Sequence, residues 1–476
     1  MRRVSRTSGP SELLLELDRS APVPLRDQLA SRLRDAIRLG SLRAGVRLPA
    51  SRVLAAELRV SRGVVVEAYD ELHAQGFLRV TPRSAPVVVA VPGAPRSKAP
   101  APPPRAPLVD FSIEAVDTAL FDRRGWLRAY GAALDAAPGA ALAYGDPRGQ
   151  ADLRVALADY LGRARAVAAD PRDVVVCQGS IQGVHLAARL LVRAGVRRVA
   201  LEDPCGHELR AAVISAGLEP VPLPTDAHGL IVDALAGAGV GAAFLTPAHQ
   251  YPGGGTLPPE RRQALLAWAR SADVLLVEDD YDGELRYDRR PVGALQGLAR
   301  ERVLYIGTAS RTLAPALRLG WMIVPPQLAD DAGALRWELG GASPSLDQLA
   351  LARLLTSAAF ERGVRRLRVE YARRRTALMG ALERALPTAV VGGSAAGLHL
   401  TLTLPVPVGV AELAAAAAAQ RVRISTVEHF RAAPAATTTT LLLGFGRVPG
   451  AAAPLAAALL EASIGMAGHA VDRSRW

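Results

Sequence analysis

The first quarter of the chain alternates apolar and polar positions with a helical period. Apolar residues recur three to four positions apart at Leu25, Leu29, Leu33, Ala36 and Ile37. This spacing predicts an amphipathic helix that Gly40 ends, and Ser51 and Ser61 are expected to cap two further short helices. Two apolar runs, 77–80 and 86–90, flank a turn-forming segment and predict a hairpin. Three short helices followed by a two-stranded ribbon are the layout of a winged helix-turn-helix.

From residue 170 onward the apolar pattern changes to short β-branched runs that alternate with helical stretches. The runs cover residues 174–177, 199–201, 243–246, 274–277, 303–306 and 321–324. Strands that alternate with helices are typical of an α/β fold in which a parallel sheet is connected by crossover helices. The alanine run 414–419 is predicted to lie in a helix, because alanine has the highest helix propensity.

A proline-rich segment separates the two patterns. Residues 91–107 read VPGAPRSKAPAPPPRAP. Dense proline fixes φ and removes backbone donors, so this segment is expected to be a semi-stiff tether. The tether divides the 476 residues into an N-terminal unit of about 90 residues and a C-terminal unit of about 370.

Positive charge is concentrated at the N-terminal end. The net charge of the chain is +12, and residues 1–90 contribute +6 through fifteen arginines and nine acidic residues. Residues 91–108 contribute a further +3. Such a distribution is expected of a nucleic-acid-binding module. Arg52 and Arg62, on the predicted second and third helices, are placed for phosphate or guanine contacts.

The sequence also argues against several classes of protein. It has no uncharged apolar run of about 18 residues and no hydrophobic stretch typical of a signal peptide, so a cytoplasmic protein without a membrane partner is expected. Its two cysteines, Cys177 and Cys205, argue against a disulfide scaffold and against a four-cysteine metal site.

Polar and glycine-rich segments follow five of the predicted strands. They read QGSIQG, EDPCGH, PAHQYPGGG, EDDYD and GTASRT. Ligands of open α/β sheets bind outside the carboxyl ends of the strands, so these segments predict a binding site. The backbone N–H groups at Ser180 and Ile181 suit a phosphate, as do Thr308, Ser310 and Arg318. The clustered acids 278–280 need a cation, a protonated ring nitrogen or solvent, which leaves a metal ion open on this evidence.

The N-terminal unit resembles a known DNA-binding domain. Residues 24–78, which include GSLRAGVRLPASRVLAAELRVSRGVVVEAYDELHAQGFL, are similar to the DNA-binding domain of GntR-type bacterial regulators. The resemblance implies that double-stranded DNA is contacted by Arg47, Arg52, Ser61 and Arg62. The usual glycine of the wing tip is missing at residues 84–86, and Gly63 stands where polar base-reading residues are frequent.

The second unit resembles fold-type I aminotransferases across residues 109–467. The matching segments, in chain order, are YGDPRG (144–149), QGSIQG, EDP, HQYPGGG, EDDYDGELRY and GTASRTLAPALRLGW. HQYP and EDDYD behind a GntR-type head are similar to the MocR-type regulators in particular. The resemblance implies a large α/β domain (109–340) with a mainly parallel sheet, a small α+β subdomain (341–476), and a head-to-tail homodimer. On this division the N-terminal domain spans 1–90 and the linker 91–108.

The same resemblance implies a site for pyridoxal phosphate and no metal. Asp279 would pair with the pyridine nitrogen, Tyr281 with the ring hydroxyl, and Tyr251 would line the ring. The phosphate would be held by Ser180, Ile181, Thr308, Ser310 and Arg318.

The family pattern breaks where the cofactor would be attached. Arg311 replaces the lysine that bonds to the cofactor aldehyde in the family. A guanidinium stays protonated and is a poor nucleophile, so it cannot replace an amine in this role. Lys98, in the tether, is the only lysine of the chain. Lysine-dependent transamination is therefore excluded unless Lys98 of a second copy reaches the pocket.

Other positions of the reactive end differ as well. The ring-stacking aromatic residue of the family falls at Gly206, with His207 beside it as a candidate replacement. Leu442 stands where a substrate-carboxylate arginine is expected, with Arg447 nearby. The phosphate end of the predicted site thus keeps the family residues, whereas the reactive end does not.

Asp279 leaves two interpretations, because a carboxylate at a buried strand end needs a positive partner. Either a pyridinium-like ligand binds without a covalent bond, or Arg311 fills the cavity and neutralises Asp279. We expect the first, in a homodimeric transcriptional regulator whose degenerate, non-catalytic domain senses a ligand related to pyridoxal phosphate or to an amino acid. The alternatives are an active aminotransferase with an incidental DNA-binding head, and a large domain that only dimerises.

Overall fold

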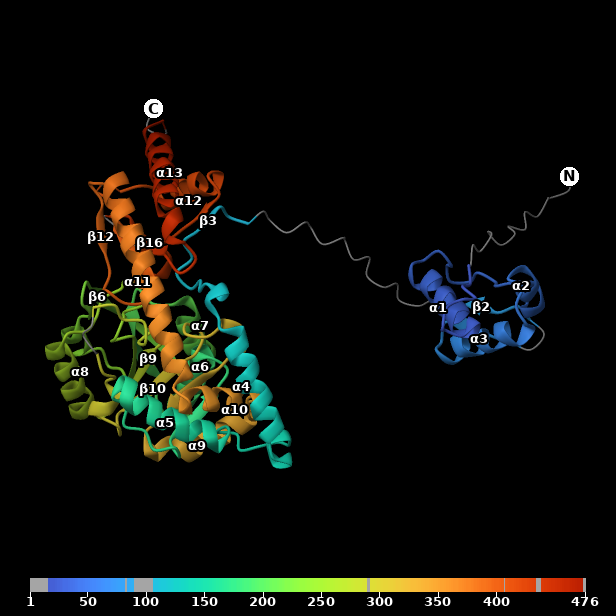
Figure 1. The fold of residues 1–476 in the computed structure, drawn as a ribbon, viewed down its shortest axis with the longest axis horizontal. Helices are drawn as coiled ribbons and strands as arrows, with labels where there is room; N and C mark the ends of the chain where they lie inside the picture. Colours follow the sequence, from blue (N-terminus) through green and yellow to red (C-terminus); the bar gives the residue numbers. More distant parts are fainter. Residues whose placement is uncertain are drawn as a thin grey trace. The chain divides into compact units, whose positions relative to one another are not determined.

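The chain forms two compact units, residues 1–105 and residues 106–476 (Figure 1). The computed structural model describes residues 16–81, 84–89, 106–288, 292–405, 407–433 and 438–473. Most of the predicted tether, Lys98 and the tip of the predicted hairpin lie outside these residues. Each unit is described by itself.

The N-terminal unit has the predicted winged helix-turn-helix layout. Its elements are α1 (Leu25–Arg38), α2 (Ser51–Glu57), α3 (Arg62–Ala74), β1 (Leu78–Arg79) and β2 (Val87–Val88). The two strands pair antiparallel. Leu29, Leu33, Leu54, Val65 and Leu72 are buried between the helices, as their helical spacing requires. The three predicted helices and the hairpin are therefore confirmed.

The two predicted helix caps differ in outcome. The Ser61 hydroxyl accepts a hydrogen bond from Val64 N at 3.4 Å and caps α3, as predicted. The prediction for Ser51 was wrong, because α2 begins at Ser51 itself and Ala50 is the residue that precedes it. The Ser51 hydroxyl lies instead 3.4 Å from Arg62 Nε, on the side of the unit where the predicted DNA contacts gather.

An eight-stranded sheet forms the centre of the second unit. In spatial order it runs β4 (Val174–Cys177), β11 (Gly320–Ile323), β10 (Val303–Thr308), β9 (Leu275–Asp280), β8 (Ala242–Leu245), β5 (Arg198–Asp203), β6 (Glu219–Asp226) and β7 (Gly229–Leu230). The pairs among β10, β9, β8, β5 and β6 are parallel, whereas β11 is antiparallel to both of its neighbours and β7 is antiparallel to β6. All six predicted strands are present, in the mainly parallel sheet that the pattern predicted.

The strand β6 was not predicted, because its sequence EPVPLPTD carries a proline at every second position. Proline has no N–H, so it is normally confined to sheet edges. Alternate residues of a strand direct their N–H groups to the same side. The three prolines therefore remove N–H groups from one side of β6 only, and the N–H groups on the side that pairs with β5 remain. The strand lies next to the edge of the sheet.

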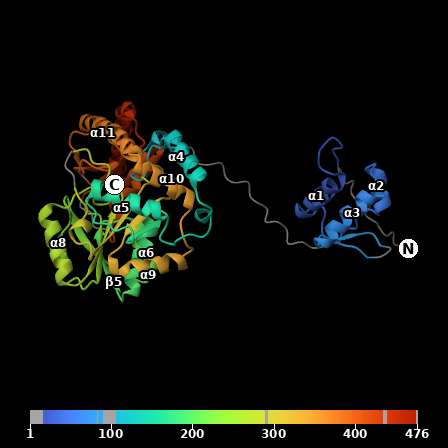
Figure 2. The same ribbon diagram turned by 60° about the horizontal axis from the view of Figure 1, so that its bottom comes forward.

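Helices cover both faces of this sheet (Figures 1 and 2). On one face α6 (Ser180–Arg193), α7 (His207–Ser215) and α9 (Ala329–Glu338) pack on Val175, Ile306 and Met322. On the other face α5 (Ala151–Arg165) and α10 (Ser345–Thr356) pack on Val176 and Trp321. A further helix, α8 (Pro259–Ser271), covers β8 and β9. The result is a three-layer α/β domain.

A smaller sheet lies in the C-terminal part of the unit. Its order is β12 (Val390–Gly392), β13 (His399–Thr403), β16 (Thr440–Gly444) and β15 (Ser425–Thr426), all antiparallel. It packs with α11 (Ala359–Ala385), α12 (Val410–Ala419) and α13 (Ala453–Arg473), and α12 contains the predicted alanine run. The helix α11 packs in the core of the large sheet and in the core of the small sheet. The predicted boundary between the large domain and the small subdomain, at residue 340, therefore stays a prediction.

The start of the unit also belongs to this smaller layer. A short strand β3 (Val109–Asp110) pairs in parallel with β14 (Val422–Arg423), and Phe111 is fully buried in the same core. The chain then crosses to α4 (Arg123–Ala136), which packs with α10. Residues 111–122 therefore connect the two layers, and this connection brings Glu114 to the candidate site described below.

One helical segment, Gly450–Ala467, which lies mostly in α13, is long and apolar enough to cross a membrane by length and composition. It contains Glu461, and Ala456, Ala457 and Leu460 are buried in the core with α11 and α12. A core helix of a water-soluble domain passes the same test, so the segment is weak evidence for a membrane span.

Candidate functional site

A cavity of about 230 Å³ opens at the carboxyl ends of the central strands. It brings together all nine residues of the predicted site: Ser180, Ile181, Tyr251, Asp279, Tyr281, Thr308, Ser310, Arg311 and Arg318. They come from the start of α6 after β4, from the loop after β8, from the carboxyl ends of β9 and β10 and the turns that follow them, and from the turn before β11. The strand-end argument thus located one site from segments up to 140 residues apart.

One end of the cavity is built to hold an anion. The helix α6 begins at Ser180, directly after Gly179, and its first two residues, Ser180 and Ile181, line the cavity. Arg318 lies against this helix start and donates a hydrogen bond to Gln178 O at 2.8 Å. Gly179 has φ +85°, and a Cβ there would lie 3.3 Å from the guanidinium carbon of Arg318. Glycine at this position therefore lets the guanidinium approach the helix N-terminus.

Two hydroxyl groups complete the anion end. The Thr308 hydroxyl lies 2.9 Å from the Ser310 hydroxyl and 3.2 Å from Leu319 O. Ser310 N donates to the Thr308 hydroxyl at 3.2 Å, which fixes this turn at the end of β10. A helix N-terminus, a guanidinium and two hydroxyls at one place suit a phosphate group.

The acids at the end of β9 have different surroundings because they alternate across the sheet. Glu278 accepts hydrogen bonds from Leu295 N at 2.9 Å and from Gln296 N at 3.1 Å. Asp280 pairs with Arg165, whose Nε lies 2.7 Å from Asp280 Oδ2. Both flanking acids, Glu278 and Asp280, therefore have hydrogen-bond or ion-pair partners within the protein. Among the described residues no group of three or more His, Cys, Asp or Glu side chains has the arrangement of a metal site.

Asp279, between them, faces the cavity without a partner. Its Oδ1 atom is shielded from solvent and has no hydrogen bond from the described residues, although the residue as a whole keeps some contact with the cavity. Burial, together with the neighbouring carboxylates Asp280 and Asp282, raises the pKa of Asp279 to about 7. A buried acceptor without a donor is costly, so this atom calls for a donor from a ligand.

Arg311 does not supply that donor. Its Nη1 donates to the backbone oxygen of Glu114, and its guanidinium carbon lies 5.9 Å from the centre of the Tyr281 ring. Within the described chain it forms no ion pair with Asp279 within 4.0 Å, although its charge lowers the pKa of Asp279 in part. The interpretation in which Arg311 fills the cavity and neutralises Asp279 is therefore not favoured by the geometry.

Tyr251 forms a side wall of the cavity. Its hydroxyl donates to Glu114 Oε1 at 2.9 Å, and its ring meets the rings of Tyr281 and Phe430 edge-on, with centroids 5.4 Å and 5.7 Å away. Gly206, where the resemblance predicts an aromatic residue, lies beside this ring: a Cβ there would lie 3.4 Å from Tyr251 Cε1, in ordinary van der Waals contact.

The two candidate replacements at the reactive end do not line the cavity. His207 stacks on Phe430 at 5.0 Å and is absent from the cavity wall. Arg447 is directed to Asp110, 3.4 Å away, and donates to Val116 O. Leu442 is fully buried in the core beside Phe430. The cavity therefore has neither a stacking histidine nor a free arginine in these places.

Sequence reasoning missed several lining residues, among them Glu114, Glu202, Glu208 and Thr246. Glu202 accepts hydrogen bonds from Thr246 N at 3.0 Å and from the Thr246 hydroxyl, and burial raises its pKa to about 7. Both residues stand at strand ends, so the signal was present in the sequence. Glu114 precedes the sheet by some 60 residues, and no strand-end pattern could have indicated it.

The predicted DNA contacts lie on one side of the N-terminal unit. Arg62 is the first residue of α3, and it lines a hollow together with Arg52 and the residues 84–86 that precede β2. Arg47 forms a backbone bridge with Val87, which places it beside the hairpin. Arg47, Arg52 and Arg62 are exposed and have no acidic partner among the described residues. Unpaired arginines at the start of a recognition helix suit phosphate contacts.

Known proteins share both units. Residues 25–88 match the description "Bacterial regulatory proteins, gntR family", and residues 125–447 match "Aminotransferase class I and II". The pyridoxine biosynthesis transcriptional regulator PdxR of Corynebacterium glutamicum is 34% identical over 400 residues, which cover 82% of this chain and 85% of the relative. The probable rhizopine catabolism regulatory protein MocR of Rhizobium meliloti is 33% identical over 395 residues, or 78% and 80% of the two chains.

Solved structures share the fold of the second unit. A kynurenine aminotransferase of Pyrococcus horikoshii, solved with PMP, matches with a TM-score of 0.70 and 24% identity, over 76% of this chain and 91% of that one. A multiple substrate aminotransferase of Thermococcus profundus matches with the same TM-score and 23% identity, over 76% and 92%. The predicted fold-type I architecture and the predicted regulator family are confirmed. The chain belongs to the MocR type of GntR-family transcriptional regulators, which join a GntR DNA-binding domain to an aminotransferase class I and II domain.

Proposed function

We propose that this regulator uses its aminotransferase-like domain as a non-catalytic sensor, which binds pyridoxal phosphate or a close relative of it without a covalent bond. The observation that carries the proposal is that Asp279 and Arg311 both line the cavity and do not pair with each other. Asp279 Oδ1 is buried without a donor, and Arg311, in the lysine position, is turned toward Glu114 O and the Tyr281 ring. The cavity thus has side chains that could bind the phosphate and the ring, and it lacks a lysine amine that could bond to the aldehyde.

The residues present fit a phosphorylated pyridine. The N–H groups at Ser180 and Ile181, the hydroxyls of Thr308 and Ser310, and Arg318 would hold the phosphate. Asp279 would hold a protonated ring nitrogen, which is the donor that its free oxygen needs. Tyr281 and Tyr251 would contact the ring.

The enzyme alternative lacks support from the residues of the cavity. In enzymes of this fold, pyridoxal phosphate supplies an aldehyde that reacts with amines and takes up electrons from the bound substrate. A guanidinium cannot attack that aldehyde, and residues 106–476 contain no lysine. The relatives are named as regulators, which also favours sensing over turnover as the role of the domain.

A homodimer is the arrangement that this proposal needs, so that two DNA-binding heads can meet two half-sites. Exposed apolar side chains support it: Leu127 and Leu134 on α4, Leu142 and Tyr144 after it, and Val155 on α5. Tyr144 is 99% exposed, which is unusual for an aromatic side chain in a folded domain. We propose that a second copy covers this surface and that the dimer acts on DNA in the cytoplasm.

The name of one relative suggests what is regulated. PdxR is named for pyridoxine biosynthesis. We propose that this chain likewise regulates genes of vitamin B6 or amino-acid metabolism, with the ligand of the cavity as the signal. A ligand acts in this scheme by favouring one arrangement of the two heads over another.

Replacing Arg62 by alanine should weaken DNA binding about tenfold, because phosphate or base contacts by an arginine contribute about 1–3 kcal/mol each. Loss of one phosphate contact should also reduce the slope of log affinity against log salt by about one unit. Fluorescence anisotropy with operator DNA at several salt concentrations measures both. Arg26→Ala is the matched control, because Arg26 pairs with Asp27 on α1. Unchanged affinity of the Arg62 variant would contradict the placement of α3 on DNA.

A further inference from the structure

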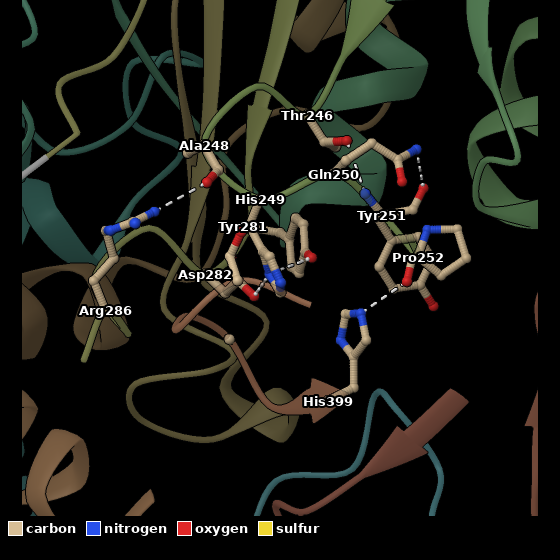
Figure 3. Close-up of polar contacts among 12 residues, drawn as sticks. Thr246, Ala248, His249, Gln250, Tyr251, Pro252, Tyr281, Asp282, Arg286 and His399 are labelled. Carbon is tan, nitrogen blue, oxygen red and sulfur yellow. Dashed lines mark hydrogen bonds and ion pairs between the residues drawn. The ribbon is translucent and has the colours of Figure 1, made fainter. Parts of the chain in front are cut away.

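Three buried side chains, His249, Tyr281 and Asp282, meet in one place (Figure 3). His249 lies in the HQYP loop after β8, and Tyr281 and Asp282 follow β9. His249 Nδ1 is 2.8 Å from Asp282 Oδ2 and 3.0 Å from the Tyr281 hydroxyl. The side chains of His249 and Asp282 are 1% and 3% exposed. Only Tyr281 of the three lines the cavity.

Gly397 and His399 close this group from the side of the small sheet. Gly397 has φ +65°, and a Cβ there would lie 2.3 Å from His249 Cε1 and 2.4 Å from Asp282 Oδ2. The ring of His399 lies 5.0 Å from the ring of His249, and its Nε2–H donates to Pro252 O at 2.9 Å (Figure 3). Burial lowers the pKa of His399 to about 3, so this ring is neutral. The packing holds His249 and Asp282 in one place.

The second nitrogen of His249 indicates which tautomer is present. Nε2 is shielded from solvent and has no hydrogen-bond partner among the described residues. A buried N–H without an acceptor is rarer and more costly than a buried lone pair without a donor. The ring proton is therefore placed on Nδ1, from which it is donated to the Asp282 carboxylate and shared with the Tyr281 oxygen.

This tautomer determines the direction of the Tyr281 proton. A protonated Nδ1 has no lone pair left, so the Tyr281 hydroxyl accepts from His249 and cannot donate to it. Its own proton is then free for an acceptor on the cavity side. Arg311 lies over the same ring, and its charge favours a negative oxygen nearby.

We propose that His249 and Asp282 are positioning residues that direct the Tyr281 hydroxyl proton into the cavity, and that this pair, rather than Tyr281 alone, determines how strongly the cavity selects ligands with the ring oxygen that the resemblance pairs with Tyr281. The inference rests on the proposed function, because it assigns the selectivity of that same cavity.

The test compares two ligands that differ in one group: pyridoxal 5′-phosphate and its 3-deoxy analogue. Calorimetry with the full-length chain should give at least about tenfold tighter binding of the 3-hydroxy ligand, since a site built to hydrogen-bond a group discriminates strongly against its absence. Tyr281→Phe should reduce this ratio to about one. A merely structural change would weaken both ligands alike and leave the ratio unchanged.

Variants of the positioning pair separate its role from that of Tyr281. Asp282→Leu removes the acceptor that holds the Nδ1 proton, so His249 can accept from Tyr281 and the ratio should fall to about twofold or less. His249→Asn keeps an N–H donor near the position of Nδ1 and should retain most of the ratio. Thr256→Val is the control, because Thr256 bonds Ser394 at 2.8 Å, outside this group.

Each contrary result has its own meaning. A wild-type ratio near one, or an Asp282→Leu chain that keeps the wild-type ratio, would overturn the inference while the proposed binding of pyridoxal phosphate stands. A wild-type chain that binds neither ligand would overturn the proposed function, and the inference with it.

Discussion

Replacing Asp279 by asparagine should weaken the binding of pyridoxal phosphate about 100-fold and, without ligand, should make the second unit more stable. The loss of affinity follows from the removal of a charge partner, which costs about 2–5 kcal/mol at a desolvated site. The gain in stability follows because Asp279 has no donor in the free protein and its carboxylate is costly to bury. Opposite signs of the two effects are typical of a residue kept for binding.

The pH dependence of stability gives this prediction a second signature. Burial raises the pKa of Asp279 from 3.8 to about 7, so the native chain binds more protons than the unfolded chain between about pH 4 and 7. The contribution of Asp279 therefore becomes more unfavourable as pH rises through this window and is complete above pH 7. Because water in the cavity lessens the effect, we expect Asp279→Asn to be more stable than wild type by about 2 kcal/mol at pH 8, and by much less at pH 4.

Urea unfolding of the second unit at pH 4 and pH 8, together with calorimetry with pyridoxal phosphate, measures both effects. Asp233→Asn is a matched control, because Asp233 is an exposed acid on the surface of the same unit. An Asp279→Asn chain that binds the ligand as tightly as wild type would show that Asp279 does not hold the ring nitrogen.

Replacing Arg165 by leucine should destabilise the second unit by about 3–5 kcal/mol, because Asp280 would remain buried as an unpaired charge. Arg165 and Asp280 share two contacts, at 2.7 and 3.1 Å, and their side chains are 4% and 2% exposed. A Cβ on Gly283 would lie 2.1 Å from Asp280 Oδ1 and 2.6 Å from Arg165 Nη2, so the packing leaves no room for a compensating group.

The double variant Arg165→Leu with Asp280→Asn is the informative comparison. Removal of both charges should recover most of the lost stability, since the penalty comes from the orphaned carboxylate rather than from the missing attraction. Urea unfolding measures the three chains. A single variant that loses less than about 1 kcal/mol would contradict the assignment of Asp280 to Arg165.

The parts of this molecule that follow from local patterns could be predicted from the sequence. The strand β4 has the predicted bounds, because a run of four apolar residues, three of them valine, is too short for a typical helix and rich in β-branched side chains. The cavity residues were found because strand ends of a parallel sheet meet at one edge. Both rules depend on chain direction and side-chain type, which a sequence contains.

The remaining features depend on contacts between distant segments. The pairing of Asp280 with Arg165 decides that Asp279 alone is left for a ligand, and no spacing in the sequence indicates it. Glu114 reaches the cavity because β3 pairs with β14, more than 300 residues away. The direction of the Arg311 side chain is likewise fixed by the backbone oxygen of Glu114.

The central claim is that pyridoxal phosphate binds this chain without a covalent bond. The most direct test is to titrate the full-length protein with pyridoxal phosphate by calorimetry, to treat the saturated sample with borohydride, and to measure after dialysis how much ligand residues 106–476 retain. We predict saturable binding of one ligand per chain, followed by complete loss of the ligand on dialysis. Either the absence of binding at millimolar ligand, or ligand retained in residues 106–476 after reduction, would contradict the claim.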